Sequence, residues 1–217
     1  MIISISGKIG SGKDTVAEII KQITPQYKWE VKKFAGKLKE VATLITGIPM
    51  DNWEDQEFKK TNLSSEWNRP IYFGGEFIND EPMTVRDLLQ LLGTEAMRNG
   101  LHTNTWVNAL FSDYLAQTVT VGENEFKFSE QDEVPNWIIT DTRFPNEVAA
   151  VKKRKGLLIK VVRDSGNKVG TTHSSETALD KFNEWDYIID NTGSKEELKQ
   201  KVFDILEKEN LIKYSSL

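Results

Sequence analysis

The sequence predicts an α/β fold in which helices cover both faces of a five-stranded parallel sheet. Five short apolar runs are mostly continuous rather than alternating, as in parallel strands that are buried on both faces. Segments with helical spacing of apolar residues lie between them, and this alternation is typical of a doubly wound sheet. The 217 residues are enough to bury a core without metal or disulfide support. The expected strands are Ile2–Ser6, Trp29–Phe34, Trp137–Asp141, Leu157–Val162 and Tyr187–Asp190.

The helices that alternate with these strands are predicted from apolar residues at intervals of three and four. In the last of them, Leu198, Val202 and Leu206 show this spacing. We therefore expect a single domain, 1–217, built in three layers. The four expected helices are Thr15–Ile23, Lys37–Thr46, Asn146–Lys155 and Lys195–Glu207.

An insertion at about 49–135 interrupts the alternation between the second and third strands. Its first part, 49–83, is polar and contains several aromatic residues. Thr84, with Asp87 three residues later, has the pattern of a capping box and predicts the start of a helix. Gly93 interrupts this helix at a cost of about 1 kcal/mol relative to alanine, unless packing or a ligand uses the space. A second helix is expected near Thr105–Leu115, and a hairpin within Val119–Pro135.

A glycine-rich segment follows the first expected strand. Residues 7–15 read Gly-Lys-Ile-Gly-Ser-Gly-Lys-Asp-Thr. A strand, a glycine turn and a helix that begins at Asp14 form an anion cradle, because backbone N–H groups converge there and the helix dipole adds positive potential. Lys13 supplies a mobile charge for the β- and γ-phosphates of a nucleotide. The alternative is an ordinary glycine turn with a surface lysine, but the strand and helix on either side favour nucleotide phosphate binding.

The residue after the loop lysine departs from the commonest pattern, which has Ser or Thr there. This chain has Asp14, followed by Thr15. Thr15 is expected to reach an α-phosphate, and Asp14 either binds Mg²⁺ through water or acts only as a helix-start acid. The spacing Gly-Lys-x-Thr is similar to that of nucleoside monophosphate kinases, and no Asn-Lys-x-Asp motif of GTPases occurs in the chain.

The third expected strand ends in a carboxylate, Asp141, and Arg143 follows two residues later. In nucleotide-binding sheets an aspartate at this place holds Mg²⁺ directly or through water. The alternative is a turn or cap residue. Arg143 either pairs with Asp141 or grips a phosphate with both arms of its guanidinium group. For Glu147, a functional role and a plain structural role are equally open. The structural role is that of an acidic residue in the first helical turn, which interacts favourably with the helix dipole.

Composition excludes several classes of function. The chain has no cysteine, and its two histidines are too few for a histidine-rich metal site. The net charge is −5 with no broad basic stretch, so we expect no stable nucleic-acid binding. The first apolar run ends at Gly7, and this run is too short for a signal peptide or a membrane span. We expect a cytoplasmic protein that acts on a small molecule and has no membrane partner.

Eight motifs occur in a fixed order along essentially the whole chain. They are Gly-Lys-Asp-Thr at 12–15, Ala-Gly-Lys-Leu-Lys at 35–39, Leu-Leu-Gln-Leu-Leu-Gly-Thr-Glu at 88–95, Trp106, Asp-Thr-Arg at 141–143, Val-Arg at 162–163, Thr-His-Ser-Ser-Glu at 172–176 and Asp-Asn-Thr-Gly-Ser at 190–194. In this order they resemble the bacteriophage deoxynucleoside monophosphate kinases. The glycine loop is common to all P-loop enzymes, whereas the leucine-rich helix motif and His-Ser-Ser-Glu are far more specific. The resemblance implies a three-layer sandwich like that of P-loop nucleoside monophosphate kinases, with helical and hairpin insertions.

The resemblance also implies roles for individual residues. Lys13, Asp141, Arg143 and Arg163 would be catalytic, and Mg²⁺ would lie at Asp141 and Asp14. ATP would bind at Gly10, Ser11, Gly12, Lys13, Asp14 and Thr15, with Asn191 and Gly193 against the adenine. The acceptor nucleotide would meet Leu38, Lys39, Arg86, Gln90, Thr94, Arg98, Trp106 and Glu176. A lid would span about 164–182.

Each of these acceptor roles has a plainer alternative. Leu38 and Lys39 also fit an ordinary amphipathic helix. The spacing by four of Arg86, Gln90, Thr94 and Arg98 also fits a solvated helix face. A helix tryptophan such as Trp106 is more often in the core than against a base. The lid segment with Arg163 and Glu176 also reads as an exposed polar loop.

The expected reaction is phosphoryl transfer from ATP to a deoxynucleoside monophosphate, in the host cytoplasm if the chain is phage-encoded. Two alternatives remain open: a kinase for another phosphorylated metabolite, such as phosphomevalonate or dephospho-coenzyme A, and a module that binds a nucleotide without transfer. Base and sugar specificity are open as well. Relatives often carry basic residues in the loop where this chain has Ile9-Gly10, and Lys8 is a shifted candidate for that contact. The aromatic segment 49–83 offers a surface for a homodimer.

Overall fold

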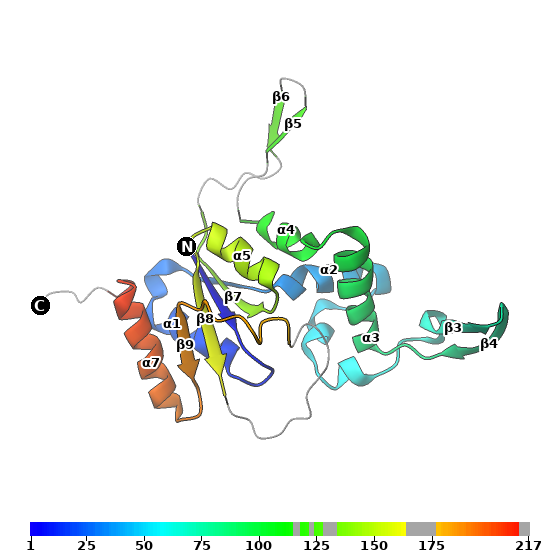
Figure 1. The fold of residues 1–217 in the computed structure, drawn as a ribbon, viewed down its shortest axis with the longest axis horizontal. Helices are drawn as coiled ribbons and strands as arrows, with labels where there is room; N and C mark the ends of the chain where they lie inside the picture. The colour runs from blue at the N-terminus through cyan, green and yellow to red at the C-terminus, as the bar shows by residue number, and fades with distance from the viewer. Residues whose placement is uncertain (115–117, 122–123, 128–133, 164–176, 213–217) are drawn as a thin grey trace, which may run out of the picture. The chain divides into compact units, whose positions relative to one another are not determined.

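A five-stranded parallel sheet with the strand order β2-β7-β1-β8-β9 forms the centre of the first of two compact units (Figure 1). The computed structural model describes residues 1–114, 118–121, 124–127, 134–163 and 177–212. The first unit consists of Met1–Phe34 and Val107–Leu217, and the second of Ala35–Trp106. The sheet strands are β1 (Ile2–Ser6), β2 (Glu30–Lys32), β7 (Trp137–Thr142), β8 (Leu157–Val162) and β9 (Tyr187–Asp190).

Helices cover both faces of this sheet, which confirms the predicted three-layer sandwich. One face packs on α1 (Lys13–Ile23) and α7 (Lys195–Lys208) through a core that includes Ile5, Ile20 and Leu206. The other face packs on α5 (Pro145–Lys153) and the end of α4 (Thr105–Phe111) through a core that includes Trp137 and Leu158. Burial on both faces explains why the central strands β7, β1 and β8 are largely apolar, whereas the edge strands β2 and β9 are partly exposed.

The strand β7 carries an irregularity beside its neighbour β1. Ser4 pairs with Ile139, but Ser6 pairs with Thr142. Between these two pairs β7 therefore contains one residue more than β1, which is a β-bulge. Such a bulge changes the direction of the side chains that follow it, and bulges are common next to functional sites. Here it lies at Thr140 and Asp141, where the sequence predicts a functional carboxylate.

The second unit has its own core around Trp53. This side chain is fully buried, and its Nε1 donates a 2.7 Å hydrogen bond to Thr43 Oγ1. Met83, Val85 and Leu88 pack in the same cluster. The elements of this unit are most of α2 (Phe34–Thr46), the 3₁₀ turns η2 (Met50–Glu54), η3 (Phe58–Lys60) and η4 (Ser65–Trp67), β3 (Arg69–Phe73), β4 (Glu76–Glu81), α3 (Val85–Gln90) and the π-helix η5 (Leu91–Leu101).

Two features of this unit differ from the sequence prediction. The helix that begins after Thr84 is α-helical only to Gln90 and continues as a π-helix, with a 2.9 Å bond from His102 N to Met97 O. An added Cβ on Gly93 would lie 2.9 Å from Leu38 Cδ2, so packing against α2 uses the space that this glycine leaves. Short π-helical segments are rare and often mark functional places, and a helical pattern of apolar residues does not reveal them.

The hairpin of β3 and β4 is the second difference, since the segment 49–83 gave no strand prediction. Its two-residue loop, Gly74-Gly75, has φ of 62° and 89°, as a type I′ turn requires. Gly-Gly between two apolar runs is a hairpin signal that the sequence did contain. The predicted hairpin within Val119–Pro135 is confirmed as β5 (Thr118–Val121) and β6 (Asn124–Lys127). None of the described helices is long and apolar enough to cross a membrane. The remaining short element is η1 (Pro25–Tyr27).

The predicted capping box at Thr84 gives a test of the second unit. Thr84 Oγ1 accepts from Asp87 N at 3.1 Å, and the Asp87 carboxylate accepts from Thr84 N at 3.0 Å. The hydrogen bond from the Thr84 hydroxyl lowers the pKa of Asp87 below its usual value, with help from Arg69 and Arg86. We expect Thr84→Ala to destabilise the protein by about 1 kcal/mol at pH 7 in thermal unfolding.

The pH dependence of this loss has a defined sign. Because the folded pKa of Asp87 is lowered, its stabilisation is present above its unfolded value of 3.8 and is lost as the pH falls through the folded pKa. The difference between wild type and Thr84→Ala should therefore narrow between pH 5 and pH 3. A difference that stays constant or grows over this range would contradict the capping contact.

Candidate functional site

The glycine loop joins β1 to α1 as the sequence predicts, and α1 begins at Lys13, one residue earlier than expected. Gly10 and Gly12 have φ of 78° and 99°, a region that favours glycine. Ser11 N donates to Lys8 O at 3.1 Å, which closes the turn before the helix. Positive φ values at these glycines are of the kind that orients successive backbone N–H groups toward one point, where an anion can bind.

Asn191, which directly follows the edge strand β9, is hydrogen-bonded to this loop. Its backbone N–H donates to Val162 O at 2.7 Å, and its side-chain Nδ2 donates to Ser11 O at 2.8 Å. Asn191 is buried, and a Cβ added to Gly12 would overlap its amide group. The resemblance assigned Asn191 to the adenine, whereas the contact present in the structure is with the loop backbone. Gly193, assigned with it, is exposed and leaves room for Glu197 to cap α7.

The side chain of Lys13 folds back onto the first residues of the loop. Its Nζ donates to Gly7 O at 2.7 Å and to Lys8 O at 2.9 Å. The ammonium group is therefore held over the loop by carbonyl oxygens, close to where α1 presents its N-terminus. A phosphate bound at this helix end would meet both the dipole and the lysine.

The two predicted metal carboxylates come from different elements of the first unit. Asp14 is exposed in the first turn of α1, with Lys33 Nζ 3.8 Å from its Oδ1. Asp141 Oδ1 accepts a 2.7 Å bond from Phe34 N at the start of α2. No group of three or more metal-binding side chains occurs among the described residues. One or two carboxylates that act together with phosphate oxygens and water are, however, how Mg²⁺ is commonly bound.

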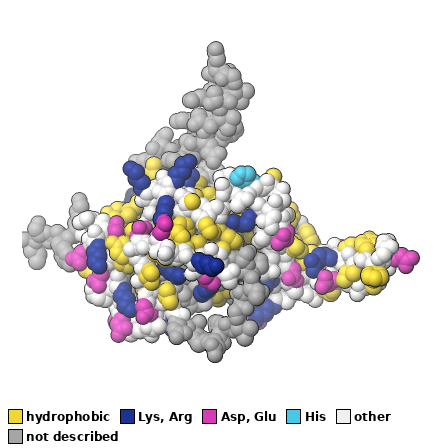
Figure 2. Space-filling view, in the orientation of Figure 1, with side chains coloured by type: hydrophobic (Ala, Val, Ile, Leu, Met, Phe, Trp, Pro, Cys, Tyr) yellow, Lys and Arg dark blue, Asp and Glu magenta, His cyan; other side chains and the backbone are white. Residues whose placement is uncertain are grey.

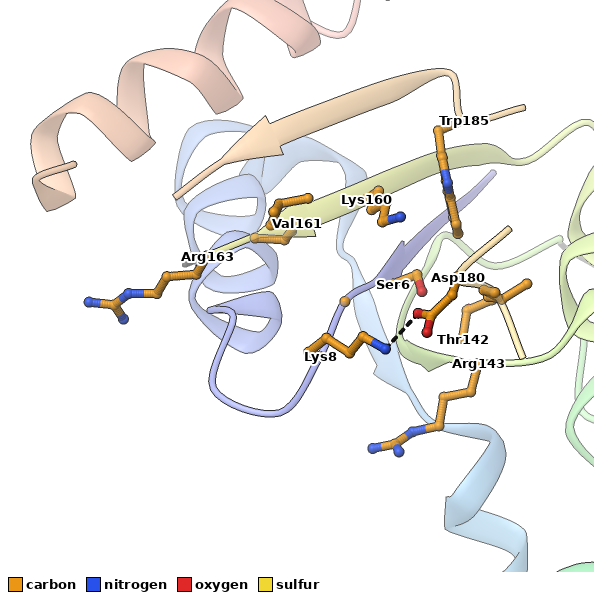
Figure 3. A pocket seen from close by; sticks show the side chains of 12 residues that line it. Ser6, Lys8, Thr142, Arg143, Lys160, Val161, Arg163, Asp180 and Trp185 are labelled. Carbon is orange, nitrogen blue, oxygen red and sulfur yellow. Dashed lines mark hydrogen bonds and ion pairs between the residues drawn. The ribbon is translucent and has the colours of Figure 1, made fainter. Parts of the chain in front are cut away.

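Arg143 and Arg163 follow the two strands that flank β1 in the sheet. Arg143 follows β7, and Arg163 directly follows β8. Figure 3 shows both guanidinium groups pointing away from Trp185 and Lys160. Glu147 is buried and accepts from Arg143 N at 2.7 Å and Phe144 N at 3.0 Å. It therefore caps α5 and holds the backbone from which Arg143 extends.

These two arginines also line a cavity of about 230 Å³ in the first unit (Figure 3). Lys160, which the sequence analysis did not single out, lines it as well. A signal for Lys160 was present, because it is the only charged residue in the apolar strand Leu157–Val162. Lys8 also lines the cavity, and its Nζ pairs with Asp180 Oδ1 at 2.5 Å.

The predicted acceptor residues lie in the second unit, apart from Glu176. Leu38 and Lys39 are on α2, and Lys39 is buried with its Nζ 2.5 Å from Glu54 Oε1. Arg86 and Gln90 are exposed on α3. Thr94 and Arg98 are half-buried on the π-helix. The predicted stripe thus crosses from an α-helix into a π-helix.

Trp106 is buried, and its Nε1 donates a 2.8 Å bond to Gly93 O. This contact attaches the start of α4 to the π-helix and favours the core alternative over stacking on a base. Glu176 and the part of the expected lid at 164–176 lie outside the described residues.

Comparisons with known proteins agree with the motifs. A family model described as deoxynucleotide monophosphate kinase matches residues 75–202. The chain belongs to this family. It is similar to a deoxynucleotide monophosphate kinase of Enterobacteria phage T4, with 32% identity over 94% of this chain and 98% of the relative.

The chain is also similar to two further proteins with related names. A putative deoxynucleotide monophosphate kinase of Acanthamoeba polyphaga mimivirus is 24% identical over 95% of this chain and 96% of its own length. A deoxynucleoside-5'-monophosphate kinase of Escherichia phage T5 is 23% identical over 82% of this chain and 85% of its own length. The similarity covers both compact units, so the kinase family applies to the chain as a whole.

The contact between Gly12 and Asn191 gives a test of the loop. Gly12→Ala forces a side chain into a backbone with φ of 99° and displaces the Asn191 amide. We expect a loss of about 1–3 kcal/mol in thermal unfolding, together with weaker binding of a fluorescent ATP analogue.

Gly36→Ala is the matched control for Gly12→Ala. Gly36 lies in α2, and beyond its chain neighbours and the backbone of this helix no atom of the described residues lies within 4 Å of its added Cβ. This variant should be neutral or stabilised by up to about 1 kcal/mol. Equal behaviour of the two variants would contradict the tight contact at Gly12.

Proposed function

We propose that this kinase transfers the γ-phosphoryl group of ATP to a deoxynucleoside 5'-monophosphate, with Mg²⁺, and releases ADP and the deoxynucleoside diphosphate. The observation that carries the proposal is the glycine loop with Lys13 over its carbonyls and Asp141 on the strand beside it. Family membership supports the acceptor class. The reaction would take place in the cytoplasm.

In this reaction the protein would contribute positioning and charge stabilisation rather than covalent catalysis. An oxygen of the acceptor phosphate attacks the γ-phosphorus, and the bond from that phosphorus to the bridging oxygen of ADP breaks. The attacking oxygen is already ionised at neutral pH, so no general base is needed. When bound, Mg²⁺ would neutralise charge on the β- and γ-phosphates, with Asp141 and Asp14 as its protein carboxylates.

Three cationic side chains have roles in this proposal. Lys13 would leave the carbonyls of Gly7 and Lys8 for the β- and γ-phosphates. Arg143 and Arg163 would stabilise charge on the transferred group, because a guanidinium contacts two phosphate oxygens at once. Gly10–Thr15 would hold the phosphate chain, with Gly193 and Asn191 nearer the adenine.

The acceptor would be held by polar side chains of the second unit. Lys39 and Glu54 form a charge pair from which Lys39 can contact a phosphate, and Leu38 offers an apolar surface. Arg86, Gln90, Thr94 and Arg98 would read the phosphate and base, while Trp106 positions the π-helix. Glu176, with the lid at 164–182, completes the proposed acceptor set. A kinase for another phosphorylated metabolite is disfavoured by the family membership.

A deoxynucleotide panel with matched variants tests the proposal. We expect ADP release that depends on at least one of the four common deoxynucleoside monophosphates. Lys13→Ala should lower kcat by on the order of 100-fold or more, because it removes a cation that stabilises the transition state. The control is Lys21→Ala, a partly exposed lysine later in the same helix, which should keep full activity.

Two results would exclude this mechanism. ADP release that no deoxynucleotide raises above background would make the chain a nucleotide-binding module. Full turnover by Lys13→Ala would remove the role given to the loop lysine.

We also propose that the hairpin of β3 and β4 joins two copies of the chain. Tyr72, Phe73, Phe77 and Ile78 are all more than half exposed, and Figure 2 shows apolar side chains gathered on this hairpin. The described core of the second unit contains none of these residues. A two-stranded hairpin is marginally stable alone, and its unpaired edges and apolar side chains favour association with an identical hairpin.

The oligomeric state is measured by analytical ultracentrifugation. We expect a dimer for the wild type and at least tenfold weaker association for the double variant Phe73→Ser, Phe77→Ser. Ile188→Ser, which replaces an exposed apolar residue of β9, is the control and should leave the dimer intact. A monomeric wild type, or a dimer that survives the double substitution, would rule out the hairpin interface.

A further inference from the structure

The cavity beside the glycine loop carries an excess of positive charge. Its described lining includes the ammonium groups of Lys8 and Lys160 and one carboxylate, Asp180. Arg143 and Arg163 line it as well, with their guanidinium groups pointing away from Lys160 (Figure 3). These residues come from the carboxyl ends of β1, β7 and β8 and from the chain after residue 177. A concave surface with this balance of charge attracts anions, because low-dielectric walls concentrate the field of the cations.

This cavity adjoins the part of the glycine loop that is proposed to hold the donor phosphates, Gly10–Thr15. Gly7 and Lys8 belong to its lining, but no residue of Gly10–Thr15 is among the described lining residues. The backbone N–H groups of Gly10–Thr15, including those at the start of α1, are therefore not part of its described lining. An anion in this cavity would be bound by side chains.

Lys160 has no role in the proposed reaction. It lies on β8 opposite Ser6 of β1, and its Nζ is 5.7 Å from the centre of the Trp185 ring. No carboxylate among the described residues pairs with it. A half-buried ammonium whose one compensating group among the described residues is an aromatic ring is stabilised when an anion arrives.

Asp180 lines the same cavity and is the counter-ion of Lys8. Its Oδ1 lies 2.5 Å from Lys8 Nζ, and Figure 3 shows this pair on the side of the cavity near Thr142. Both side chains are more than half exposed, and exposed pairs of this kind contribute little to stability. A phosphate group carries more charge than a carboxylate, so it can take Lys8 from Asp180 at small cost.

We propose that this cavity is an oxyanion site for a phosphate or pyrophosphate group, with Lys160 and Lys8 as its cations and Asp180 as the group that the ligand displaces. The volume of about 230 Å³ is below the roughly 300–1,000 Å³ of pockets that enclose drug-sized ligands. The site therefore takes a phosphate group rather than a whole nucleotide. That group comes either from a free oxyanion or from the end of a nucleotide's phosphate chain.

Isothermal titration calorimetry distinguishes these sources. Pyrophosphate is titrated into protein that is saturated with a non-hydrolysable ATP analogue, and the analogue is titrated into free protein. We expect Lys160→Met to weaken one of these two binding events by about tenfold. Loss of pyrophosphate affinity identifies a free oxyanion, and loss of analogue affinity identifies the nucleotide's phosphate chain. Asp180→Asn should strengthen the same event several-fold.

Lys152→Met is the matched control. Lys152 also lies over an aromatic ring of the neighbouring segment, with its Nζ 5.4 Å from the centre of Phe182, but it does not line the cavity. It should leave both binding events unchanged. The proposal is overturned if Lys160→Met and Lys152→Met give equal affinities in both titrations, or if Asp180→Asn weakens binding. Because binding is measured without turnover, the result stands whether or not the proposed phosphoryl transfer is found.

Discussion

The side-chain amide of Asn191 donates to the carbonyl of Ser11 across 180 residues of sequence, and the geometry of the glycine loop depends on this bond. It connects the end of β9 to the turn before α1, while the Asn191 backbone holds β8 through Val162. Gly12 has no side chain and a positive φ, so the amide can approach closely enough to form the bond. A loop fixed in this way presents its N–H groups in advance, which lowers the cost of ordering it around a phosphate.

The rest of the first unit arranges charge around that loop. The bulge in β7 sets the direction of Asp141, whose carboxylate receives the first N–H of α2. Glu147 is buried at the start of α5 and accepts one hydrogen bond each from the backbone N–H groups of Arg143 and Phe144. The side chains that would meet a nucleotide are therefore held by strand ends and helix starts. Rigid supports of this kind suit a reaction in which positioning and electrostatics supply most of the catalysis.

The sequence was sufficient to predict the parallel sheet, its helices and the glycine loop, because buried strands and amphipathic helices leave strong periodic patterns. Asp141 and Arg143 could be found because they follow a buried strand. Three features had weaker signals. The π-helix after Gln90 depends on packing of Leu38 at Gly93 and on the bond from Trp106, which are contacts distant in sequence. The β7 bulge depends on register with β1. Lys160 gave only one charge in an apolar strand.

Phosphoryl transfer in the proposed reaction is direct, from ATP at the glycine loop to a deoxynucleotide acceptor. The most direct measurement follows the γ-³²P label of ATP in the presence of Mg²⁺ and each deoxynucleoside monophosphate. We expect the label to appear in the β-phosphate of the deoxynucleoside diphosphate, with one ADP formed for each label transferred, and Lys13→Ala to slow this transfer strongly. Label that appears only as inorganic phosphate, or that stays in ATP with every acceptor, would contradict it.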